Sequence, residues 1–155
     1  MLFIVVYSSF FWYDKDTLKF RQRLSGSAGA YRLKYRDGRN MISISLCMIV
    51  KNEEAVLARC LDSVADLVDE IIIVDTGSTD RTKEIGAGYT DRIYDFQWSH
   101  DFSAARNYAF SLASCDYIYS ADADEVLEGE NRERFRLLKE TLLPEEEIVQ
   151  MKDGN

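Results

Sequence analysis

No glycine-rich phosphate-binding loop occurs in these 155 residues. Gly77 stands alone, and the chain contains neither a dinucleotide-binding fingerprint nor a P-loop. Histidine is scarce too: His100 is the only one, and no serine, cysteine or metal partner stands at a spacing that a known motif uses. We interpret His100 as a structural or exposed residue. Any phosphate-binding site in this chain must therefore be built from other groups.

Cysteine is limited to Cys47, Cys60 and Cys115. These residues are odd in number, lie within apolar strand or helix patterns and lack the spacing of metal ligands. The pattern favours buried, reduced thiols in a cytoplasmic protein.

The sequence has no apolar run long enough to span a membrane. Residues 1–13 are uncharged and mostly apolar, but a spanning helix needs roughly 20 apolar residues. Basic residues follow this run, whereas a signal peptide carries them in front, and no small-residue cleavage site comes directly after it. We expect no spanning segment. The alternative is a segment that binds the membrane surface through its aromatic and basic side chains.

Most of the chain lacks a net basic charge, because its acidic residues outnumber its basic ones. Residues 1–40 hold eight Lys/Arg and three Asp/Glu, a net charge of +5, so the total of −8 leaves −13 on residues 41–155. Such an acidic body argues against a nucleic acid partner, because binding the phosphate backbone needs a basic surface. We interpret residues 1–40, aromatic and then basic, as an appended or mis-started extension outside the core. The functional domain is expected at residues 41–155.

From residue 41 onward the hydrophobic pattern alternates between strand and helix, without repeats or low-complexity linkers. This alternation predicts an α/β fold with a Rossmann-like, mainly parallel sheet and flanking helices, whose ligands gather at the carboxyl ends of the strands. The expected strands cover residues 42–50, 71–74, 91–96 and 117–121, with another starting at residue 148. The expected helices cover residues 53–68, a short stretch from 80 toward 85 that Gly86 and Gly88 close, 102–112 and 130–142.

Acidic residues follow three of the expected strands. Lys51-Asn52-Glu53-Glu54 follows the first strand, Asp75 ends the second, and Asp122 and Asp124 follow the fourth. Side chains at i and i+2 of an extended segment leave the same face, so Asp122 and Asp124 can direct their carboxylates at one point. Oxygen ligands suit Mg²⁺ and Mn²⁺, and Mg²⁺ typically takes one or two carboxylates plus the phosphates of a substrate. This aspartate pair is therefore a candidate metal site.

Each candidate also has a simpler interpretation. Asp75 can be a turn residue that accepts hydrogen bonds from nearby backbone N–H groups, and aspartates are also common where a strand breaks into a turn. Glu53 can be a first-turn helix acid, which the helix dipole favours. Arg106, expected at the beginning of a helix, is either a surface arginine or a cation placed to meet a diphosphate.

Four motifs, taken in order and spacing, resemble those of family 2 glycosyltransferases with the GT-A fold. They are Leu46–Glu54, Val74–Asp80, Asp101–Asn107 and Ala121–Glu125. Within that family the sequence is similar to bacterial enzymes of the lipopolysaccharide-core glucosyltransferase and peptide S-glycosyltransferase type. The resemblance covers residues 43–128 and implies the nucleotide-sugar-binding half of such an enzyme.

By this resemblance, Asn52, Glu53 and Asp75 hold the base and ribose of a nucleotide-diphosphate sugar, and Arg106 approaches the diphosphate. The implied activity is transfer of the sugar to an acceptor, which is a glycan, a lipid-linked sugar or a peptide. Family members that invert the sugar need a carboxylate that deprotonates the acceptor, and we expect an inverting reaction.

The same resemblance implies that Asp122 and Asp124 bind Mg²⁺ or Mn²⁺, which neutralises charge on the departing nucleoside diphosphate. In the family, the general base lies well after this pair. Because only 31 residues follow Asp124, we expect the base beyond Asn155 and a domain that is incomplete at its C-terminus. Glu125 and Glu128 are better interpreted as helix-cap acids than as substitutes for the base.

Two other classes of function stay open. One is a non-catalytic remnant that binds a nucleotide diphosphate and metal, or that pairs with another chain. The other is a nucleotidyltransferase, which also combines an α/β sheet with acidic metal ligands. A nucleotidyltransferase is expected to carry a glycine-rich, basic loop near the first strand, and Leu46–Glu54 contains no glycine.

Overall fold

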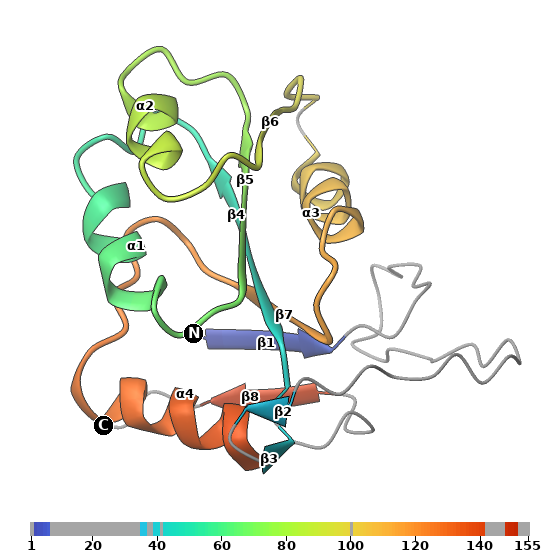
Figure 1. Ribbon diagram of the computed structural model, residues 1–155. Coiled ribbons are helices and arrows are strands. Elements are labelled where there is room, and N and C mark those ends of the chain that lie inside the picture. The colour runs from blue at the N-terminus through green and yellow to red at the C-terminus, as the bar shows by residue number, and fades with distance from the viewer. Residues whose placement is uncertain are drawn as a thin grey trace, which may run out of the picture.

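The strands of the main sheet lie in the order β6-β5-β4-β7-β1-β8 (Figure 1). The computed structural model describes residues 2–6, 35–36, 39–40, 42–99, 101–141 and 148–151, with side chains for 42–99 and 101–140. Four neighbouring strands pair in parallel, and they are β4 (Ile44–Val50), β5 (Glu70–Asp75), β6 (Ile93–Asp95) and β7 (Tyr117–Ser120). The predicted Rossmann-like, mainly parallel arrangement is confirmed.

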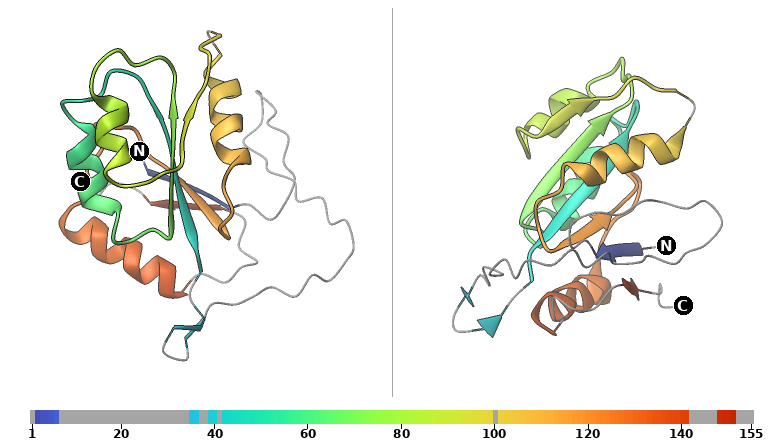
Figure 2. Two further views of the ribbon diagram at one scale, coloured as in Figure 1. Left: turned by 45° about the horizontal axis from the view of Figure 1, so that its top comes forward. Right: turned by 90° about the vertical axis from the view of Figure 1, so that its right-hand side faces the viewer.

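Helices cover both faces of this sheet (Figure 2). On one face lie α1 (Leu57–Val64) and α2 (Thr82–Ala87), and on the other lies α3 (Phe102–Ser111). A fourth helix, α4 (Gly129–Thr141), lies next to the lower end of α1 in Figure 1.

Alternating side chains of the central strands enter two separate cores. In β4, Leu46 and Met48 belong to the core that α1 and α4 cover, whereas Cys47 belongs to the core beneath α3. Tyr119 of β7 packs edge-on against Phe135 of α4, with ring centroids 5.3 Å apart. Because both faces of these strands are buried, their sequences are continuous apolar runs rather than alternating ones.

Two of the expected helices differ from the structure. The helix expected over residues 53–68 is the shorter α1, because residues 53–56 form a turn that leads into it and a second turn after Val64 leads toward β5. Gly86 lies inside α2 and does not end it: a Cβ at this position would stand 2.9 Å from Cδ1 of Ile73. The glycine allows α2 to approach β5 closely.

Phe102 does not share the buried face of α3 that its spacing predicted. Ala105 and Ala109 are buried, but 65% of the Phe102 surface is exposed and its ring contacts Trp98 at a centroid distance of 4.7 Å. Phe102 is the first residue of α3, and the sheet residues that bury this face pack further along the helix. The apolar periodicity therefore extends one turn beyond the buried part.

The interpretation of residues 1–40 as lying outside the core needs a correction at one segment. β1 (Leu2–Val6) pairs antiparallel with β7 on one side and with β8 (Ile148–Met151) on the other. The outer edge of β7 needs a partner for its backbone groups, and this apolar N-terminal run supplies it. Residues 35–36 (β2) and 39–40 (β3) form a separate two-stranded hairpin. The domain boundary near Met41 stays a proposal.

The thiols of Cys47 and Cys60 are free and buried, whereas Cys115 is free and half-buried. Burial raises the pKa of Cys47 to about 12 and is the main cause that raises the pKa of Cys60 to about 11. Both buried thiols are therefore protonated at neutral pH.

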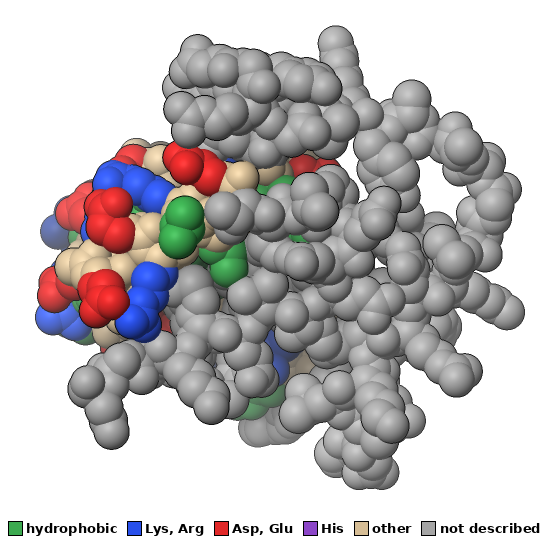
Figure 3. Space-filling view, turned by 90° about the horizontal axis from the view of Figure 1, so that it is seen from below, with side chains coloured by type: hydrophobic (Ala, Val, Ile, Leu, Met, Phe, Trp, Pro, Cys, Tyr) green, Lys and Arg blue, Asp and Glu red, His purple; other side chains and the backbone are tan. Residues whose placement is uncertain are grey.

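The exposed side of α4 is charged, as its sequence indicated. Ion pairs join Arg134 to Glu130 and Arg136 to Glu133, each at 2.7 Å. Seen from below, described side chains of both signs lie next to one another (Figure 3). None of the helices in the described part of the chain is long and apolar enough to cross a membrane.

Candidate functional site

The loops after β4 and β5 meet where the parallel strands end, here called the carboxyl edge, and the loop after β7 runs toward the same edge. Val50 at the end of β4 pairs with Asp75 at the end of β5. On the other side of β4, Cys47 pairs with Ser120, the last residue of β7. The residues after Ser120 therefore continue past β4 toward the same edge. The parallel direction of these strands is what the sequence predicted.

Asp75 has two carboxylate oxygens in different surroundings. Only 2% of the residue is exposed. Its Oδ2 accepts from the backbone N–H groups of Gly77 and Ser78 at 3.0 and 2.9 Å, and Gly77 adopts a φ of 102° that favours glycine. Its Oδ1 is buried and finds no hydrogen-bond partner among the described residues. Asp75 is thus a turn residue through one oxygen, while the other is available to a hydrogen-bond donor from a ligand, because buried acceptors are rarely left unpaired.

Asn52 connects the loop after β4 to the turn after β5. Its Oδ1 accepts from the backbone N–H of Thr79 at 2.8 Å, and its own N–H donates to the Ser78 hydroxyl at 2.9 Å. Its φ of 56° lies in the left-handed region, which asparagine tolerates better than most residues. The amide oxygen of Asn52 therefore holds the neighbouring loop in place.

Glu53 and Glu54 extend the same contact. The backbone N–H of Glu53 donates to the buried Thr82 hydroxyl at 2.7 Å, and Thr82 donates to Oδ1 of Asp80 at 2.5 Å. Glu54 accepts from the backbone N–H of Arg81 at 2.9 Å. Glu53 precedes α1, whose first turn contains no acidic residue, so the first-turn interpretation of Glu53 does not apply. The two loops form one hydrogen-bonded unit.

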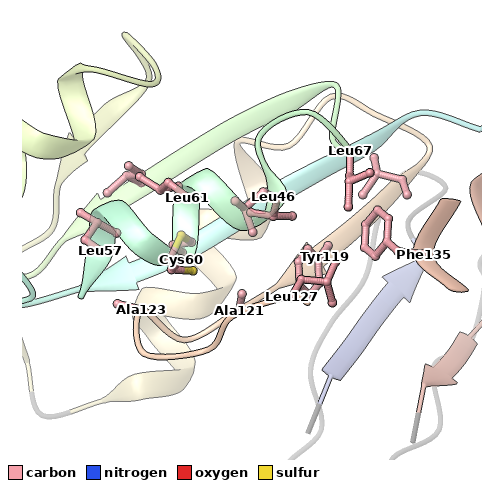
Figure 4. Close-up of a cluster of buried hydrophobic side chains, with 14 of the residues drawn as sticks. Leu46, Leu57, Cys60, Leu61, Leu67, Tyr119, Ala121, Ala123, Leu127 and Phe135 are labelled. Carbon is pink, nitrogen blue, oxygen red and sulfur yellow. The ribbon is translucent and has the colours of Figure 1, made fainter. Parts of the chain in front are cut away.

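Asp122 and Asp124 lie on a turn directly after β7. Ala121 and Ala123 are both 4% exposed and point into the core near α1 (Figure 4), while both aspartates are exposed. The turn is closed by Glu125, whose backbone N–H donates to the Asp122 carbonyl at 3.1 Å and whose Oε2 accepts from the Asp122 N–H at 3.3 Å. The strand ends earlier than expected, but burial still alternates as it would in an extended segment.

This donor set fits one kind of metal site. No group of three or more His, Cys, Asp or Glu side chains that could hold a metal occurs in the described residues. Asp122 and Asp124 therefore do not form a closed protein cage. Two exposed carboxylates match the coordination of Mg²⁺ or Mn²⁺ by one or two protein oxygens, with water and substrate phosphates completing the shell.

Arg106 is not joined to the acidic loops. It is the fifth residue of α3 rather than a residue at its beginning, which Asp101 caps by accepting from the N–H groups of Ser103 and Ala104. Its side chain is exposed and makes no hydrogen bond or ion pair that is seen in the described part of the chain. Within the described residues, Arg106 is thus an exposed and unpaired cation of α3. His100 lies outside the described residues.

The sequence pattern did not single out the polar residues that support the site. They are Ser78, Thr79, Asp80 and Thr82, which join the two loops, and Cys60 and Ser63 of α1, which contact the loop of Asp122. The run of Ser, Thr and Asp after Asp75 was a visible signal as part of the Val74–Asp80 motif, but it did not show that these residues join the two loops. For Cys60 and Ser63 the sequence contained no such signal.

Comparison with known proteins agrees with this arrangement. The model of the family described as Glycosyl transferase family 2 matches residues 45–136. A TPR repeat-containing protein of Synechococcus elongatus is 50% identical over 90 residues, which are 58% of this chain and 22% of that protein. The SPbeta prophage-derived glycosyltransferase SunS of Bacillus subtilis is 38% identical over 92 residues, also 58% of this chain and 22% of that protein.

Two further likenesses cover more of the chain. The lipopolysaccharide core biosynthesis glycosyltransferase LpsC of Rhizobium meliloti is 33% identical over 112 residues, 70% of this chain and 40% of that protein. The crystal structure of S. aureus TarS 1–349 shares the fold, with a TM-score of 0.52 and 22% identity over 60% of this chain and 31% of that chain. The chain thus spans less than half of the length of each of these proteins.

Proposed function

Because the chain belongs to glycosyl transferase family 2, we propose that its core binds a nucleotide-diphosphate sugar and a divalent cation for transfer of the sugar to an acceptor. One observation carries this proposal. The buried Oδ1 of Asp75 has no partner in the described residues, and it lies at the carboxyl edge toward which the loop of Asp122 and Asp124 also runs.

Asp75 binds the nucleoside in this proposal. Its Oδ1 accepts a hydrogen bond from an N–H of the base or an O–H of the ribose, while Oδ2 stays bonded to the turn. Since a buried carboxylate oxygen gains a partner only when the ligand arrives, the bond favours the bound state. Asn52 and Glu53 complete this part of the site, because their loop is hydrogen-bonded to the turn after Asp75.

Asp122 and Asp124 are the residues that would hold Mg²⁺ or Mn²⁺. When bound, the metal supplies positive charge that stabilises the departing nucleoside diphosphate. Arg106 provides a second cation for the diphosphate, since its guanidinium pairs with no acidic group in the described residues.

The finer features of the reaction are part of the proposal. We infer an inverting transfer to a glycan, a lipid-linked sugar or a peptide, and the name of LpsC favours a saccharide acceptor. No described residue is assigned as the general base: Glu125 bonds the Asp122 N–H, and Glu128 is an exposed residue just before α4. The free thiols support a cytoplasmic location.

Ligand-dependent unfolding tests the proposal. Uridine diphosphate with Mn²⁺ is expected to stabilise the protein by about 2.7 kcal/mol when its concentration is near 100 times its dissociation constant. A chelator should remove most of this effect.

Replacing both Asp122 and Asp124 by alanine should abolish the Mn²⁺ dependence and leave the fold intact, because both side chains are exposed and neutralising crowded carboxylates removes repulsion. Equal stabilisation with chelator, or unfolding of the double variant, contradicts the metal role.

A further inference from the structure

The loop that carries Asp122 and Asp124 is fastened to α1 at both of its ends. At the first end, the Cys60 thiol lies 3.6 Å from the Asp122 carbonyl oxygen and donates to it. At the other end, the backbone N–H of Leu127 donates to the Ser63 hydroxyl at 3.0 Å. Asp122 is itself the first anchor point, and Asp124 lies between the two.

Ser63 is itself held in place. Its hydroxyl donates to the Cys60 carbonyl at 2.7 Å while it accepts from Leu127, so donor and acceptor are both used. Its carbonyl accepts from the Arg132 guanidinium of α4, and Arg132 also pairs with Asp66 at 2.6 Å. The end of α1 that supports the loop is therefore braced by a second helix.

The apolar side of the loop packs on the same helix. Ala121, Ala123 and Leu127 are buried and belong to one cluster with Leu57 and Cys60 of α1 (Figure 4). The small alanine side chains let the loop backbone approach the helix closely. The aspartates between them are left on the exposed side, so the position of the backbone decides where their carboxylates point.

We propose that Ser63 and Cys60 are positioning residues for the metal: they fix the backbone of residues 122–127 and thereby set the affinity of Asp122 and Asp124 for Mg²⁺ or Mn²⁺ without touching the ion. This inference rests on the proposed function, because it takes the two aspartates as ligands. Groups that orient metal ligands from outside the coordination shell influence affinity strongly, and their loss typically costs about 10- to 100-fold.

Ser63→Ala in the full chain tests the proposal, with two measurements. Mn²⁺ binding in the presence of uridine diphosphate, followed by electron paramagnetic resonance of the free ion, is expected to weaken about tenfold. Hydrogen exchange at the Leu127 amide, which needs no ligand, is expected to lose protection. Ser63→Thr keeps the hydroxyl and should restore both properties.

The matched control is Ser111→Ala in α3. Ser111 donates to the Tyr108 carbonyl at 2.7 Å, the same bond to the residue three positions earlier that Ser63 makes, but in a helix on the other face of the sheet. Mn²⁺ affinity and Leu127 protection should both stay at the wild-type level in this variant. Cys60→Ala should weaken Mn²⁺ binding in the same direction as Ser63→Ala, by less, since a thiol is a weak donor.

Three results overturn the inference. Wild-type Mn²⁺ affinity in Ser63→Ala despite loss of Leu127 protection would show that the loop anchor does not control the ligands. Unchanged Leu127 protection would show that Ser63 does not hold the loop. If the wild-type protein itself fails to bind Mn²⁺ with uridine diphosphate, the metal role proposed for the aspartates fails and this inference fails with it; that case is recognised from the wild type alone.

Discussion

At the scale of single residues, Asp75 holds a turn with one oxygen, and in the proposed function it binds the nucleotide with the other. Asp75→Asn is expected to weaken nucleotide binding about 10- to 100-fold, because an NH₂ group replaces the acceptor that the ligand needs and a hydrogen bond to a charged group is lost. The remaining amide oxygen can still accept from Gly77 and Ser78, so the unfolding free energy should change by less than about 1 kcal/mol. Calorimetric titration and denaturant unfolding measure the two effects.

Asp95→Asn is the control for this substitution. Asp95 ends β6 beside Asp75, with which it pairs in register, but its side chain is exposed and bonded to Lys83 at 2.6 Å. Nucleotide affinity should not change in this variant. A large loss of stability in Asp75→Asn with unchanged affinity would leave Asp75 as a turn residue only.

Cys47 makes the free energy of unfolding of the protein depend on pH. Burial raises its pKa from 9.0 to about 12. The contribution of Cys47 to the unfolding free energy is therefore fully present below pH 9. It is lost as the pH rises toward 12, because the unfolded chain releases the thiol proton at a lower pH than the folded protein does. Between about pH 8 and about pH 10.5 the wild type should lose about 2 kcal/mol more unfolding free energy than Cys47→Ala. Denaturant titrations at both pH values test this, and an equal loss in the two proteins would contradict it.

At the scale of elements, the contact between the loop after β4 and α2 depends on Thr82. Thr82→Val keeps the side-chain shape but removes the acceptor for the Glu53 N–H and the donor to Asp80. We expect the unfolding free energy to fall by about 1 kcal/mol, because a half-buried N–H is left unpaired. Nucleotide affinity should fall as well, since the loop of Asn52 and Glu53 loses its support.

Thr90→Val is the control that separates the loss of stability from the loss of nucleotide affinity. The Thr90 hydroxyl also makes two hydrogen bonds, donating to the Ile71 carbonyl at 2.9 Å and accepting from the Arg92 N–H at 3.0 Å. These bonds lie near the amino end of β5, far along the strand from Asp75. A similar loss of stability with unchanged nucleotide affinity is expected, and an equal loss of affinity in both variants would show that Thr82 acts only through global stability.

The sequence predicted the positions of the strands, because these depend on the hydrophobicity of the strand residues themselves. The apolar runs of β4, β5 and β7 fixed their positions closely, because strands buried on both faces are continuously apolar. They could not show that Asn52 bonds Thr79, since those two loops meet only after the strands pair. For Asp75 the sequence could not decide between a turn residue and a ligand-binding residue, because the same aspartate at a strand end serves either equally well.

At the scale of the whole molecule, β1 joins β8 to the rest of the main sheet. A variant that begins at Met41 is expected to bind uridine diphosphate and Mn²⁺ as tightly as the full chain, because the candidate site residues all lie between Asn52 and Asp124. Amide protection at Ile148–Met151 should be lost, since in the described residues β8 pairs only with β1. Calorimetry and hydrogen exchange test the two statements.

Ile4→Pro in the full chain is the companion variant, because it disrupts β1 and leaves the remaining residues of the extension present. It should reproduce the loss of protection at β8. Weaker nucleotide binding in either variant would show that the N-terminal strand supports the site, contrary to the proposed boundary near Met41.

The pairing of β1 has a consequence during synthesis. Leu2–Val6 is made before its partners Tyr117–Ser120, which follow more than 100 residues later. This apolar segment lacks its partner until those residues are made, and exposed strands are prone to aggregate. Pairings between segments so distant in sequence form slowly, so Leu2–Val6 needs chaperone protection until β7 has been made.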